Sequence, residues 1–236
     1  TVYSSSNLCG NGTTNCNIVI LRLNSDLTAI LGRTEIGGND LDELAAMTIA
    51  NDGSLVLAGT TESPNFPVTS GSYDASCGDN GQCDGTESTD FFGNNGRHSD
   101  GFIAVLDANL QGVQRGTFLG GNNTDEITAL AIDSDGDIYV AGSAISSGFP
   151  TSSDAYQSSF SGFGPSVISR LDSQLETLKA STFWKSDSGS AWPIYDIAVH
   201  EGEVFVTGSA RFSGLPAAAS GFQTDYFADG CSGCTL

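Results

Sequence analysis

Residues 127–143 read ITALAIDSDGDIYVAGS, and this stretch decides the fold because two variants of it occur elsewhere in the chain. Residues 44–60 read LAAMTIANDGSLVLAGT, and residues 194–209 read IYDIAVHEGEVFVTGS. Each copy is an apolar segment, a turn that contains Gly, and a second apolar segment. Such a turn between two short apolar runs predicts a β-hairpin. A hairpin that recurs at intervals indicates stacked units, which bury their apolar faces against one another.

The repeat extends well beyond the hairpin. Two further apolar segments precede each hairpin, and an aromatic residue or Leu followed by Pro comes after it, as in Phe149-Pro150. Each unit therefore holds four short strands, and no segment shows helical periodicity over three turns. We predict an all-β, β-propeller-like array of four-stranded antiparallel blades in a single domain, residues 1–236. Its units are residues 17–100, 101–165 and 166–225, and its cysteine-containing ends are residues 1–16 and 226–236.

The number of units poses a problem for a propeller. Propellers usually have about four to eight blades, whereas this chain has three units. A stack of three leaves open faces and edges, which favour association. We therefore expect a part of a larger propeller, or a propeller completed by a protein partner or by other copies of the chain.

The middle unit carries a family likeness. Residues 100–157 contain DGFIAVLDANLQGVQRGTFLGG, then ITALAIDSDGDIYVAGS, then FPTSSDAYQ. This pattern resembles the bacterial SBBP repeat, a β-propeller repeat of surface and secreted proteins, and the likeness covers three copies over about residues 17–225. The resemblance implies an extracellular propeller. It implies no shared catalytic residues.

The charge of the chain excludes some partners. Eight basic residues stand against 28 acidic ones, which gives a formal net charge of −20. Such a surface repels nucleic acid and anionic membranes. Because of this charge, we expect no nucleic-acid binding. No run of about 18 apolar residues is present, so we expect no membrane insertion.

Six cysteines form three close pairs, and each pair lies between the end of one unit and the start of the next. Even number and local pairing suggest disulfides in an oxidising compartment, and we expect an extracellular or cell-surface location. A zinc site would need more pairs with C-x2-C spacing. Covalent haem would need a His after the last pair. We expect no cofactor on these grounds. The pairs are Cys9 with Cys16, Cys77 with Cys83, and Cys231 with Cys234.

Carboxylates offer two candidate sites. Asp133, Asp135 and Asp137 alternate along one turn, where hard oxygen ligands could hold calcium; a plain hairpin turn is the alternative. Asp40, Asp42 and Glu43 follow the Gly-Gly turn of the first unit and align with Asp125 and Glu126, which follow that of the second. They predict either a ring of carboxylates that binds cations or a basic partner, or simply solvated turn residues.

Catalysis is not indicated. The only histidines are His98 and His200, and neither lies in a motif for a Ser/His/Asp triad. We predict a secreted or cell-surface, non-catalytic propeller module that acts as a structural or interaction unit in an extracellular assembly. The alternative is a carbohydrate-binding or carbohydrate-active propeller with a site on one face of the blades.

Overall fold

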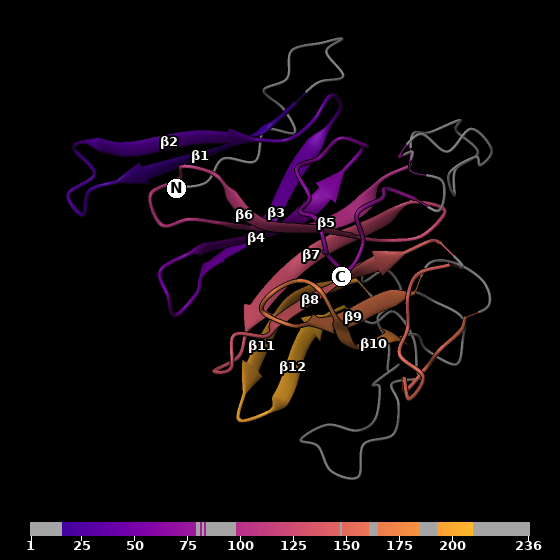
Figure 1. The fold of residues 1–236 in the computed structure, drawn as a ribbon. Helices are drawn as coiled ribbons and strands as arrows, with labels where there is room; N and C mark the ends of the chain where they lie inside the picture. Colours follow the sequence, from indigo (N-terminus) through magenta and orange to yellow (C-terminus); the bar gives the residue numbers. More distant parts are fainter. Residues whose placement is uncertain are drawn as a thin grey trace, which may run out of the picture.

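The structure is a computed structural model that describes residues 16–78, 81, 83, 98–146, 148–160, 165–184 and 193–209. Within these ranges it contains twelve β-strands and no helix (Figure 1). The strands are β1 (Ile18–Leu23), β2 (Ile30–Ile36), β3 (Asp42–Ile49), β4 (Leu55–Thr61), β5 (Asp100–Leu106), β6 (Val113–Leu119), β7 (Asp125–Ile132), β8 (Ile138–Ala144), β9 (Ser166–Leu171), β10 (Leu178–Trp184), β11 (Ile194–His200) and β12 (Glu203–Gly208). The all-β fold class is confirmed.

The strands form two complete antiparallel sheets and two half-sheets. The complete sheets have the orders β3-β4-β5-β6 and β10-β9-β8-β7, and β1-β2 and β11-β12 are two-stranded. Each complete sheet therefore joins the hairpin of one repeat unit to the first two strands of the next unit. Four-stranded antiparallel blades are confirmed, but the expected match of one unit to one sheet is wrong, because the second strand of each hairpin has an open edge that the next unit occupies.

A glycine in each hairpin permits the pairing of its two strands. The register shifts within β3, β7 and β11, opposite Gly59, Gly142 and Gly208. These shifts are β-bulges, which bring the backbone of one strand close to the other. A Cβ at Gly142 would lie 1.8 Å from the carbonyl oxygen of Glu126, and one at Gly59 would lie 2.0 Å from that of Glu43. The hairpin repeat thus ends in Gly because a Cβ at this position would clash with the backbone of the facing strand.

A leucine recurs in the turn between the first two strands of each unit. Leu27, Leu110 and Leu175 all have positive φ, between 58° and 62°. The Asn or Asp three residues before each Leu accepts backbone N–H groups of the turn through its side chain. Asp107, for example, accepts from the N–H of Gln111 at 2.7 Å. This Asx-type bonding holds the turn in a conformation that a bulky side chain rarely adopts.

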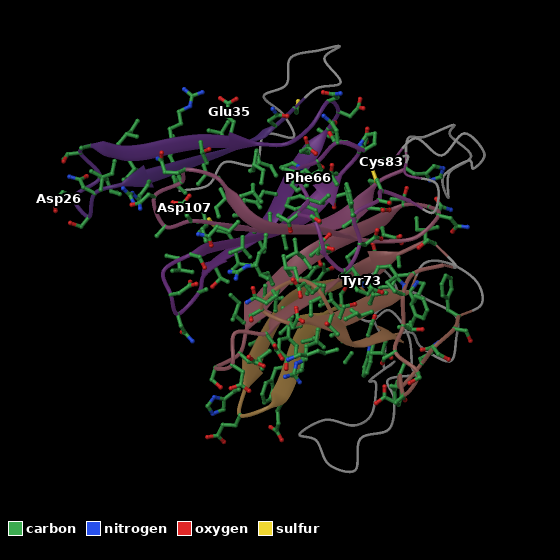
Figure 2. All side chains as sticks on the ribbon, in the orientation of Figure 1. Asp26, Glu35, Phe66, Tyr73, Cys83 and Asp107 are labelled. Atoms are coloured by element: carbon green, nitrogen blue, oxygen red, sulfur yellow. A yellow bond between two sulfur atoms is a disulfide. The ribbon has the colours of Figure 1, made fainter. Side chains whose placement is uncertain are left out.

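Three apolar cores hold the stack together. The first lies between β1-β2 and the β3–β6 sheet, the second lies between the two complete sheets, and the third joins β7-β8 to β11-β12. In the first core the rings of Phe66 and Phe102 are 4.3 Å apart. Figure 2 shows Phe66 and Tyr73 inside the stack, and Asp26 and Glu35 on its outside.

The half-sheets lie at opposite ends of this stack (Figure 1). Over the described residues the sheets do not close into a ring. Each end consequently presents the kind of surface that elsewhere in the chain is covered by a neighbouring sheet.

Candidate functional site: the open ends of the sheet stack

Exposed apolar side chains gather at the two ends. Among the described residues ten large apolar or Tyr side chains are exposed, and seven of them have counterparts in other units that contact a neighbouring sheet. Since single exposed apolar residues are ordinary but clusters mark interaction sites, the ends are the candidate functional surfaces. The N-terminal surface consists of Leu27, Ile30, Met47 and Ile49. The C-terminal surface consists of Tyr156, Val204 and Phe205.

The N-terminal surface has buried counterparts in the interior units. Leu27 is 72% exposed, whereas the equivalent Leu175 is 0% exposed in the core between the two complete sheets. Leu130 and Ile132, the counterparts of Met47 and Ile49, pack against that same core. The exposure of this surface follows from its position at the end of the stack, and its chemistry is that of a packing surface.

The C-terminal surface shows the same contrast. Tyr73 packs against the second core, and its N–H donates to the carbonyl oxygen of Leu175 at 2.6 Å. Its counterpart Tyr156 is exposed and lies beside Trp184, with ring centroids 5.9 Å apart. Phe205 is exposed at the position where the preceding hairpin has the buried Tyr139. This surface therefore also resembles one half of a sheet-to-sheet contact.

A groove runs beside β12 on the face of β9 and β10. Its volume is about 290 Å³. In the second core, β9 and β10 themselves occupy the equivalent position against the β3–β6 sheet. The groove is therefore the place where the outer two strands of a further sheet would lie. Residues of its wall include Tyr139, Tyr156, Ile168, Arg170, Thr182 and Val204.

A cluster of charged groups adjoins this groove. Arg170 lies over the ring of Tyr139, 5.2 Å from its centroid, and its Nε donates to Oδ2 of Asp137 at 2.8 Å. Lys179 Nζ lies 2.7 Å from Oδ1 of the same carboxylate. Burial would raise the pKa of Asp137, but hydrogen bonds from Lys179 and Arg170 hold it below its ordinary value. The cluster ties three strands of the second sheet together.

The three predicted calcium ligands lie in or beside the β7–β8 turn. Oδ1 of Asp133 accepts the N–H groups of Asp135 and Asp137, each at 2.9 Å, as in a hairpin turn. Asp137 carries the ion pairs with Arg170 and Lys179. Over the described ranges, no group of three or more His, Cys, Asp or Glu side chains is arranged to hold a metal ion. The calcium site stays a prediction.

Two carboxylates that were expected to be solvated or to bind cations are buried instead. Asp42 accepts from the N–H of Gly38 at 2.7 Å and from the hydroxyl of Ser63 at 3.1 Å. Asp125 accepts from the N–H of Gly121 at 2.8 Å and from the hydroxyl of Ser146 at 2.6 Å. Each carboxylate thereby joins the turn before its strand to the loop after its hairpin. The expectation that Asp42 and Asp125 are solvated turn residues is wrong, because these hydrogen bonds make their burial possible.

Burial changes how Asp125 responds to pH. Burial raises the pKa of Asp125 to about 7, and the hydrogen bonds from Ser146 and Gly121 only partly offset it. The unfolded value is about 3.9, so the stabilising contribution is complete below that pH and is lost as pH rises through about 7. We predict that the unfolding free energy of the native protein falls relative to Asp125→Asn by up to about 1.4 kcal/mol per pH unit between these values. Urea titrations from acid to neutral pH measure this, and parallel profiles would contradict it.

One of the predicted disulfides is described in full. Cys77 and Cys83 form a disulfide with their Cα atoms 5.2 Å apart, and both belong to the first core. Cys16 is also disulfide-bonded. Cys9, Cys231 and Cys234 lie outside the described residues, so the pairs predicted for them stay predictions.

Removal of the described disulfide has a definite expected effect. The loop that it closes is short, so loop-closure entropy predicts a loss of about 2 kcal/mol of unfolding free energy in the double variant Cys77→Ala, Cys83→Ala. Chemical denaturation under oxidising conditions measures this loss and leaves the other cysteines as they are. An unchanged midpoint would show that the disulfide adds nothing to the stability of the first core.

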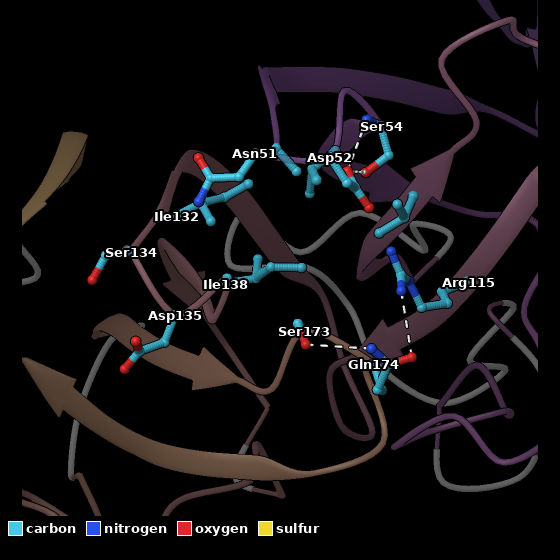
Figure 3. Close-up of a pocket in the computed structure, with 14 residues that line it drawn as sticks. Asn51, Asp52, Ser54, Arg115, Ile132, Ser134, Asp135, Ile138, Ser173 and Gln174 are labelled. Atoms are coloured by element: carbon cyan, nitrogen blue, oxygen red, sulfur yellow. Dashed lines mark hydrogen bonds between the residues drawn. The ribbon is translucent and has the colours of Figure 1, made fainter.

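A second cavity, of about 220 Å³, lies between the hairpin turns of the two complete sheets (Figure 3). Arg115 reaches it from β6 and donates to Oε1 of Gln174 at 3.4 Å. Asp52 lines the cavity near Arg115, and its Oδ1 accepts from the N–H of Ser54 at 2.9 Å. Sequence reasoning missed this cavity, because its walls come from three turns and the strands beside them, which no motif connects.

The two histidines do not form a catalytic centre with each other. His98 is buried just before β5, and His200 is exposed at the end of β11, where its Nε2 lies 3.9 Å from Glu201. The two strands belong to different sheets.

In the described part of the chain we find no helix with the length and apolar character needed to cross a membrane. A comparison with curated proteins finds no match. A family model, SBBP or Beta-propeller repeat, matches residues 115–150. The matched segment runs from β6 through the β7–β8 hairpin to Pro150, so it crosses from one complete sheet to the next. Residues 115–150 are therefore similar to the SBBP β-propeller repeat, in agreement with the sequence resemblance of the middle unit.

Proposed function

We propose that this chain is a non-catalytic β-propeller module that acts as a structural or interaction unit in an extracellular or cell-surface assembly. The observation that carries the proposal is the pair of open, apolar sheet ends, the N-terminal and C-terminal surfaces. A stable protein rarely leaves such surfaces in water. The Cys77–Cys83 disulfide supports an oxidising compartment.

Two measurements on the organism's own cells test this proposal. A membrane-impermeant biotin reagent should label the protein on intact cells or in the culture medium, and labelling only after lysis would contradict the location. Chemical cross-linking before lysis should shift the protein to a species heavier than the same protein without cross-linker. A protein that stays at the mass of one chain would contradict its role in an assembly.

One observation favours the carbohydrate-binding alternative. Tyr156 is exposed beside Trp184 at the edge of the groove, and polar Ser152, Asp154 and Thr182 also line it. Exposed aromatic rings next to polar groups suit the apolar face and hydroxyls of a sugar. A glycan array tests this second candidate, and Tyr156→Ala should then lose the signal. Absence of any bound glycan would rule it out.

A further inference from the structure

We propose that the β1-β2 half-sheet of a second copy of this chain lies in the groove beside β12, so that β11-β12 and the second copy's β1-β2 form one four-stranded sheet. The inference rests on the proposed function and names the partner at the C-terminal surface. The association is head to tail: the N-terminal surface of one copy meets the C-terminal surface of the other.

The chain itself contains two examples of this pairing. The second strand of one hairpin pairs with the first strand of the next unit, in the register Ala58↔Ile103 for β4 with β5 and Ala141↔Ile168 for β8 with β9. Aligned on the hairpin glycine, β12 presents Thr207 at the same position. The equivalent residue of β1 is Ile20, because Ile20, Ile103 and Ile168 each come three residues before the Leu that ends their strand. The predicted register therefore pairs Thr207 with the second copy's Ile20.

The exposed side chains fit the contacts that such pairing would make. Leu175 in the turn before β10 is buried against the preceding sheet, beside Tyr73. In the proposed junction the second copy's Leu27 takes the place of Leu175, and Tyr156 takes the place of Tyr73. Two side chains that are exposed in one copy are thus brought into a contact that the chain already makes internally.

The inner strands complete the same surface. Tyr139 on β8 is buried against β11 in the third core. Phe205 is the counterpart of Tyr139 on β12, and the second copy's β3, with Met47 and Ile49 exposed, is the counterpart of β11. The junction would therefore cover Phe205 as well. All seven residues of the two surfaces border it.

The number of sheets gives the size of the assembly. Head-to-tail contacts form a ring when the rotation between copies closes, and an open filament when it does not. Two copies with two junctions would contain six four-stranded sheets, of which four lie within chains and two are shared. Six lies within the range of about four to eight blades in propellers. The expected assembly is a ring of two chains.

Light scattering coupled to size exclusion tests the proposal on the 236-residue chain at about 0.15 M salt, where the repulsion between acidic surfaces is screened. We expect twice the 24.3 kDa mass of one chain. A single-chain mass at micromolar concentration would overturn the proposal. A series of masses that grows with concentration would overturn the ring of two.

Matched variants test the head-to-tail geometry. Leu27→Asp alters only the N-terminal surface, and Phe205→Asp alters only the C-terminal one; each alone should give single chains with an unchanged circular dichroism spectrum. Asp is well tolerated at the positive φ of Leu27. Leu31→Asp is the control: Leu31 is also exposed, but its counterparts are Gln114 and Lys179, so the mass should stay doubled.

Mixing the two variants gives the decisive result. The mixture retains one intact junction, between the N-terminal surface of Phe205→Asp and the C-terminal surface of Leu27→Asp. We expect two-chain species to reappear only in the mixture. Failure to associate on mixing would overturn the junction, since a two-fold contact between like surfaces predicts no rescue. In that event cross-linking on cells still decides whether the chain works in an assembly with another partner.

Discussion

Gly142→Ala should reduce the unfolding free energy by about 3 kcal/mol or more, at the upper end of overpacking effects. The added Cβ would lie 1.8 Å from the carbonyl oxygen of Glu126 and 2.8 Å from its carbonyl carbon. Both atoms belong to the backbone of β7, which cannot move away without breaking its pairing with β8. Urea denaturation followed by fluorescence measures the change.

Gly112→Ala is the matched control for this variant. No heavy atom lies within 4 Å of a Cβ built at Gly112, so its effect should stay within about 0.5 kcal/mol. Equal effects at the two glycines would mean that the β-bulge opposite Gly142 is not as close as described.

Leu175→Ala should cost about 2–5 kcal/mol, as expected for a fully buried leucine. Its side chain is 0% exposed and joins the core between the two complete sheets. The control is Leu27→Ala, at an equivalent turn with nearly the same positive φ. Because any backbone effect of alanine is shared, the difference between the two variants reports side-chain packing alone.

For the single chain, Leu27→Ala should change stability by less than about 0.5 kcal/mol, since this side chain is 72% exposed. The comparison is made with chains kept apart by the Phe205→Asp background. A large cost at Leu27 there would show that the N-terminal surface is already covered within one chain, and it would contradict the open end described above.

The strands were predictable from the sequence, whereas the sheets were not. Apolar runs between turn residues predicted four strands in each unit, and the aligned hairpins predicted β7 and β8 closely. A repeated pattern, however, has no marked starting point: four consecutive strands can be grouped from any of them. Only the pairing of β4 with β5 and of β8 with β9 determines the grouping, and it leaves half-sheets at both ends.

The candidate site was predictable in kind but not in its residues. Three units are too few for a ring, so open ends were expected. Nothing in the sequence indicated that Leu27 has a special position in its turn. A positive φ is expected for Gly or Asn, but not for leucine. Asp125 was misread because its partner Ser146 lies 21 residues away, in the loop after the hairpin. A carboxylate so far from its hydrogen-bond donors in sequence looks like a solvated turn residue.

Methyl–methyl nuclear Overhauser effects on a protein labelled at Ala, Ile, Leu and Val test most directly that sheets form across unit boundaries. Directly paired residues have Cβ atoms about 4.5–5.5 Å apart, so we predict cross-peaks for Ala58 with Ile103 and for Ala141 with Ile168. Absence of both, with cross-peaks that join β2 to β3 and β6 to β7 instead, would place each sheet inside one unit. The chain would then have no half-sheets to complete.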